Sequence, residues 1–126
     1  MRTFSQQLTQ NLQPEDCVIQ SMADVSPTRW HLAHTTWFFE TFILQPARPQ
    51  RKSHHPAFEY LFNSYYNSVG QQFPRAQRGL LSRPTLAEVW DYRLAIDAEV
   101  EQWLSSVEDD VWRPLAPVFQ IGLQHE

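Results

Sequence analysis

The sequence has one cysteine, no long apolar run and no excess of basic residues. Because Cys17 is alone, a disulfide within the chain is excluded, and a free thiol is typical of a reducing compartment. No stretch approaches the roughly 18 apolar residues of a transmembrane helix, and no apolar signal-peptide core follows Met1. These absences predict a soluble, cytoplasmic protein with no membrane partner.

The charge balance excludes another class of partner. The formal net charge is −4, and Arg48, Arg51 and Lys52 form only a small basic group. Proteins that bind nucleic acid present a larger basic surface to the phosphates, so no nucleic-acid partner is expected. Hydrophobic residues make up 42% of the 126 residues, enough for one core and one domain over residues 1–126.

Apolar and polar residues nowhere alternate over a length that predicts a strand, whereas the helical spacing of apolar residues recurs. This spacing predicts helices over residues 3–12, 26–44, 56–66, 86–107 and from 118 onward. Segments 45–56 and 71–84 contain several helix breakers and are expected to be irregular. The predicted fold is an all-α, four-helix bundle.

The helix predicted over residues 26–44 is the centre of this bundle. Ser26 is a suitable N-cap, and Pro27 suits the first helical position. Trp30, His34 and Trp37 fall in one sector of the helix and are expected to be buried. Apolar residues cover most of the remaining surface and leave a narrow polar strip around Arg29, Thr36 and Glu40.

Other local patterns give narrower predictions. Residues 15–25 form a connector whose apolar members are expected to lie against the bundle: Val18, Ile19 and Met22. Gly70 is placed to end the 56–66 helix, and residues 85–88 form a capping box before the next one.

The histidines raise the question of a metal site. His34 and His125 each lie on the inward face of a predicted helix, so a bundle would bring them near one cation. A stable site needs at least a third ligand, and none is evident. His31 is offset by about 60° around the helix from His34, and His54 and His55 lie in a loop. The alternative interpretation is that each imidazole only makes a structural hydrogen bond.

Three segments carry a family resemblance. They are QSMADVSPTRWHLAHTTWFFETF at residues 20–42, YLFNSYY at 60–66 and RGLLSRPT at 78–85. Together they resemble the N-terminal DinB-like domain of the ergothioneine synthase family. The resemblance extends over nearly the whole chain and implies a DinB-like helical bundle.

The resemblance also implies a chemistry. The family binds a non-haem Fe(II) through three histidines and joins a cysteine-containing thiol to trimethylhistidine, forming a sulfoxide. His34 matches the first ligand, and His125 with Glu126 matches the start of a later His-Glu-x-x-His pattern. Arg75 and Arg78 match a basic pair that contacts the carboxylates of the thiol substrate. Three neutral nitrogens leave Fe(II) open positions for O₂ and sulfur.

The second histidine of that pattern would follow Glu126, the last residue of the sequence. We therefore expect a fragment of a larger enzyme, with the last helix truncated and both the third ligand and the C-terminal catalytic domain absent. Such a chain is expected to be inactive, with His34 and His125 close together but binding a metal loosely or not at all. It is also expected to self-associate through an exposed apolar face formed by Tyr65, Tyr66 and the last helix.

Two alternatives stay open at this point. One is a free-standing DinB-like thiol transferase that uses a divalent metal to activate a thiolate. The other is a non-catalytic helical binding module that keeps the fold without the chemistry.

Overall fold

The computed structural model describes residues 2–126, and these residues form helices and loops without a strand. The elements, in chain order, are α1 (Arg2–Thr9), η1 (Asp16–Val18), α2 (Thr28–Phe39), η2 (Glu40–Leu44), α3 (Gln45–Ala47), α4 (Phe58–Phe62), η3 (Arg75–Leu80), α5 (Leu86–Leu104) and α6 (Asp109–His125). Here η1 and η3 are 3₁₀ segments and η2 is a π-helical segment. The predicted all-helical bundle is confirmed.

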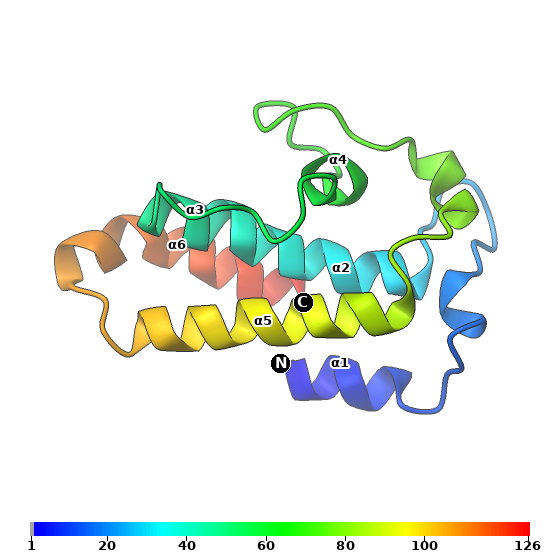
Figure 1. Ribbon diagram of the computed structural model, residues 1–126, viewed down its shortest axis with the longest axis horizontal. Helices are drawn as coiled ribbons and strands as arrows, with labels where there is room; N and C mark the ends of the chain where they lie inside the picture. Colours follow the sequence, from blue (N-terminus) through cyan, green and yellow to red (C-terminus); the bar gives the residue numbers. More distant parts are fainter. Residues whose placement is uncertain (1) are drawn as a thin grey trace.

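Three long helices form the body of the molecule. Helices α2 and α5 pack along each other, and α6 packs against α2 and η2 (Figure 1). Helix α4 contacts α2, and α1 lies beside α5 on the side away from α4 (Figure 1). Because α2 touches α4, α5 and α6, it is the central helix that the sequence predicted.

The core forms where α2, η2 and α5 meet. Its most completely buried apolar side chains include Trp37, Ile43, Leu44, Val89 and Ile96. Burial of Trp30, His34 and Trp37 is confirmed.

The polar strip of the central helix is also buried, because its side chains form hydrogen bonds within the protein. Arg29 donates to the carbonyls of Leu81 and Ser82, and Glu40 accepts from Arg51 and Tyr92.

The start of the central helix differs from the prediction by one residue. Pro27 is the N-cap, and no side chain caps the helix. The prediction of Ser26 as the cap is wrong, because its hydroxyl instead accepts a hydrogen bond from Arg78 at 2.8 Å. The predicted capping box is confirmed, since Thr85 and Glu88 each bond the other's backbone N–H.

The ends of α4 and α5 differ from the prediction. Helix α4 ends at Phe62, short of Tyr66 and Gly70, because the Asn63 side chain bonds backbone groups of both residues and closes a turn. Gly70 has φ 156° but does not end a helix. Helix α5 ends at Leu104, three residues before the predicted end.

Helix α6 begins at Asp109, well before the predicted start at residue 118, and includes Pro114 and Pro117. Both prolines lie on the exposed side, where water can bond the carbonyls they leave unpaired. The other side packs apolar residues on the core, which offsets the proline cost: Trp112, Leu115, Val118, Phe119 and Leu123.

The N-terminal segment, from α1 to the connector before α2, buries few side chains. No residue of α1 is buried, and Ile19 and Met22 are 65% and 60% exposed, so the prediction that they lie against the bundle is wrong. Cys17 is the buried residue of this connector. No helix within residues 2–126 has both the length and the apolar character to cross a membrane.

Candidate metal centre

A hydrogen bond at Nδ1 fixes the orientation of the His34 ring. Nδ1 lies 2.6 Å from the carbonyl oxygen of Phe62, the last residue of α4. A carbonyl can only accept, so Nδ1 carries the proton and Nε2 keeps a free lone pair. This is the arrangement that orients a metal-binding histidine.

His125 meets this lone pair from the last turn of α6. The two Nε2 atoms are 3.2 Å apart, and the rings cross at 83°. Two nitrogens on one tetrahedral ion at ~2.0 Å would be roughly 3.3 Å apart, so the pair fits two adjacent ligand positions. The predicted proximity of the two histidines is confirmed.

The close packing of α6 on α2 depends on Gly122, which lies one turn before His125. A Cβ at Gly122 would lie 2.8 Å from Phe39 Cζ and 3.1 Å from Phe38 Cε1. The absence of a side chain therefore lets the end of α6 approach the α2 surface that carries His34.

Aromatic burial keeps His34 neutral. Its ring stacks between Trp30, at 4.7 Å and 14°, and Trp37, at 5.6 Å and 21°. Burial lowers the pKa of His34 to about 4, although the Phe62 carbonyl opposes this and the positive charges of nearby groups add to it. Burial also lowers the pKa of His125. Neutral imidazoles at pH 7 are the form that binds a metal.

A cavity of about 350 Å³ opens beside this histidine pair. Arg78 reaches it with 1% of its surface exposed and lies 3.5 Å above the Trp30 ring. It donates to Ser26 and to the carbonyl of Asn63, and its Nε has no partner among the described residues. Burial, reinforced by Arg75, lowers the pKa of Arg78 to about 10.

Arg75 lines the same cavity, with its guanidinium over the Tyr65 ring and a hydrogen bond to the carbonyl of Asp24. Within residues 2–126, neither Arg75 nor Arg78 pairs with a carboxylate. A buried guanidinium without a counter-ion favours an anionic ligand.

His31 faces the same cavity but does not complete the metal site. The described residues contain no group of three or more side chains able to hold a metal ion. The described residues thus offer two ligand positions on one ion, those of His34 and His125.

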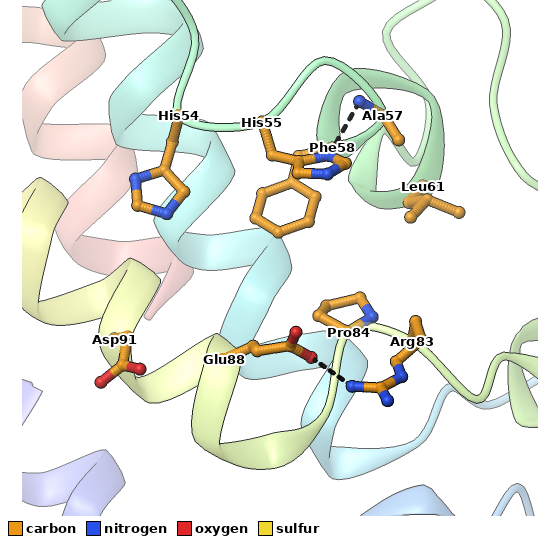
Figure 2. Close-up of a pocket in the computed structure, with 9 residues that line it drawn as sticks. All are labelled: His54, His55, Ala57, Phe58, Leu61, Arg83, Pro84, Glu88 and Asp91. Carbon is orange, nitrogen blue, oxygen red and sulfur yellow. Dashed lines mark hydrogen bonds and ion pairs between the residues drawn. The ribbon is translucent and has the colours of Figure 1, made fainter.

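A larger cavity lies elsewhere, between the loop before α4 and the start of α5 (Figure 2). It measures about 580 Å³ and is lined by His54 and His55 together with Arg83, Glu88 and Asp91. Arg83 and Glu88 form an ion pair at 3.3 Å, and the histidine rings lie against aromatic side chains. No ligand group converges here either.

Sequence reasoning missed the residues that support the histidine pair. The Phe62 carbonyl carries no signal, because every residue has a carbonyl. The buried polar contacts of Arg93 with Glu126 join residues 33 positions apart, and no local pattern marks them.

A family model described as the DinB superfamily matches residues 1–126. The chain belongs to the DinB superfamily. This superfamily is generally metal-binding, which agrees with the chemistry of the histidine pair. No curated protein matches the chain significantly.

Proposed function

We propose that this DinB-superfamily chain is the metal-binding domain of a non-haem Fe(II)-dependent sulfoxide synthase of ergothioneine biosynthesis. His34 and His125 would hold the ion, and Arg75 and Arg78 would bind the carboxylates of a cysteine-containing thiol. The observation that carries the proposal is the 3.2 Å approach of the two Nε2 atoms, one of which has its tautomer fixed by a carbonyl.

The adjoining cavity supports the thiol as substrate. A carboxylate would neutralise the unpaired Arg78 and Arg75, and the thiol sulfur would then extend toward the histidine pair that lines the same cavity. Bound Fe(II) would supply the oxidising chemistry with O₂, whereas the chain's own residues bind, orient and desolvate the thiol. Trimethylhistidine is the expected second substrate.

Two ligands hold a metal more weakly than three, so the chain alone should bind Fe(II) loosely and be inactive. Anaerobic calorimetric titration with Fe(II), or with Co(II) as a surrogate, tests this. We expect weak one-to-one binding that is lost in His34→Ala and in His125→Ala but kept in His31→Ala. Tight binding that also disappears in His31→Ala would overturn the two-ligand assignment.

The anion pocket has its own test. Cysteine titrated into the protein should perturb the NMR signals of residues around Arg78, and Arg75→Gln should weaken this response. Arg113→Gln, which changes an exposed arginine on α6, is the control. An equal response in Arg75→Gln and wild type would contradict the thiol assignment.

A DinB-like thiol transferase is the second candidate, because the family match identifies the DinB superfamily and no narrower group within it. It would use the same histidine pair and cavity without consuming O₂. Oxygen uptake with thiol and trimethylhistidine, measured on a chain that supplies all three ligands, separates the two candidates. A non-catalytic module would show neither O₂ uptake nor thiol transfer.

A further inference from the structure

The two histidines of the candidate site are held in different ways. His34 has the Phe62 carbonyl on Nδ1, whereas no hydrogen bond to Nδ1 of His125 is found within residues 2–126. Within the part of the chain that the structure describes, the aromatic rings beside His125 are those of His34 and of Phe38, whose ring centroid is 5.2 Å away. Apart from its Nε2 contact with His34, the position of the His125 ring therefore depends on the backbone that carries it.

The next residue is tightly fixed. The Glu126 carboxylate accepts from Arg93 Nη2 at 2.6 Å and Ser5 Oγ at 2.7 Å through one oxygen. It accepts from Arg2 Nη1 at 2.6 Å through the other. Its side chain is only 4% exposed, and that of Arg93 only 3%. Charged hydrogen bonds of this length in a buried setting are strong and directional.

Arg93 connects this carboxylate to the helix that carries His34. Its Nη1 donates to the Leu32 carbonyl at 2.7 Å and to the hydroxyls of Thr35 and Thr36. These residues flank His34 in sequence, just as Glu126 adjoins His125. One guanidinium on α5 therefore bonds residues close in sequence to both histidines.

Arg2 completes the arrangement from α1. It pairs with Asp97 of α5 at 3.0 Å through Nε while Nη1 holds Glu126. Helix α1 buries no side chain, so these polar contacts, rather than apolar packing, join it to the bundle. Through Arg2, α1 thus holds the residue that follows α6, Glu126.

We propose that Glu126, held by Arg93 and Arg2, is a positioning residue that sets His125 against His34. This inference rests on the proposed metal site and adds to it a support that acts through the backbone of α6. The group of Glu126, Arg93, Arg2 and Ser5 is called the carboxylate clamp below. Loss of the clamp frees the last turn of α6, and the two Nε2 atoms then separate.

The alternative is that the clamp only stabilises the fold, and a matched variant separates the two. Glu40 is a second buried carboxylate, 6% exposed in its side chain and bound to Arg51 at 2.6 Å. The Glu40 contacts join the start of η2 to Tyr92 of α5 and to the 48–54 loop, and none of them is made to a residue of the clamp or to His34 or His125. Glu126→Gln and Glu40→Gln should both lower the unfolding free energy, but only the first should affect His125.

The experiment compares both variants with wild type under conditions in which all three are folded by circular dichroism. The first readout is metal-free: NMR should detect a nuclear Overhauser effect between the His34 and His125 rings in wild type and Glu40→Gln. It should be lost or strongly reduced in Glu126→Gln. The second readout is Co(II) affinity, which should fall about tenfold or more in Glu126→Gln alone, as for other supports of metal ligands.

The outcomes are distinct. If Glu126→Gln keeps both the ring contact and the Co(II) affinity of wild type, the positioning role is overturned and the clamp is only structural. If wild type binds no Co(II), the proposed function fails, while the ring contact in the metal-free protein still decides the role of the clamp.

Discussion

His34 and His125 lie 91 positions apart, yet their Nε2 atoms come within 3.2 Å, whereas the rings of the consecutive His54 and His55 pack on Phe58. The first two are called the site pair here and the last two the loop pair. The loop pair lines the larger cavity, about 580 Å³ against 350 Å³. Each cavity is lined by four residues of ligand type: His54, His55, Glu88 and Asp91 around the loop pair, and Asp24, His31, His34 and His125 around the site pair.

The difference lies in convergence and desolvation. The His54 ring lies 4.8 Å from Tyr92, and the His55 ring 4.8 Å from Phe58. His55 Nδ1 accepts from the Ala57 N–H (Figure 2), and His55 as a whole is exposed. His34, by contrast, is buried between two indoles with its lone pair aimed at His125. A site thus depends on how side chains are supported more than on how many are present.

Glu40→Ala is expected to cause the largest loss of stability. It acts near the loop pair, because Glu40 binds the backbone of His54. The Glu40 carboxylate binds Arg51, Tyr92 and the His54 N–H, so its loss leaves buried polar groups unpaired. We expect the unfolding free energy to fall by about 3–5 kcal/mol in urea denaturation.

Glu101→Ala, an exposed carboxylate on α5, is the control and should change little. A loss below about 1 kcal/mol in Glu40→Ala would show that the loop is held by other contacts.

The central helix, the capping box and the inward faces of His34 and His125 could be predicted, because each depends on residues within a few turns. The start of α6 could not, since Pro114 and Pro117 break a helix by local rules, and only packing of the opposite face overrides them. Ser26 was misassigned for a similar reason, because its hydroxyl is taken by an arginine 52 positions away.

The same contrast between local pattern and tertiary contact applies to His34 and His125. The ring positions come from helical periodicity, which the sequence displays. The Phe62 carbonyl and the clamp on Glu126 come from tertiary contacts between segments 28 to 124 positions apart. Only the assembled bundle reveals them.

Gly122→Ala perturbs the site pair from the α6 side. The added methyl would crowd the Phe39 and Phe38 rings, and this overpacking should outweigh the gain in helix propensity. We expect a net loss of about 1–2 kcal/mol in unfolding free energy and a weaker contact between the His34 and His125 rings. Gln124→Ala, on the exposed side of the same turn, should leave both unchanged. An unaltered ring contact in Gly122→Ala would mean that α2 shifts with α6.

A pH series isolates the effect of burying His34, the one buried member of the two pairs. The folded-state pKa of His34 is about 4, below its unfolded value near 6.5, so the unfolded chain binds the proton more readily. Stability is therefore full above pH 6.5 and falls as the pH decreases toward 4. For metal-free protein we expect about 1 kcal/mol to be lost between pH 7 and 5.5 through this residue. His34→Gln should lack that slope, and a slope equal to wild type would contradict the burial argument.

His55→Ala is the smallest expected change. The imidazole is exposed and contributes one hydrogen bond, to the Ala57 N–H, and one ring contact with Phe58. Water can replace the hydrogen bond, so the unfolding free energy should change by less than about 0.5 kcal/mol. Co(II) affinity should stay at the wild-type value, because the loop pair supplies no ligand to the site pair. A clear loss of Co(II) binding in His55→Ala would place a metal ion in the larger cavity and reverse the comparison between the two pairs.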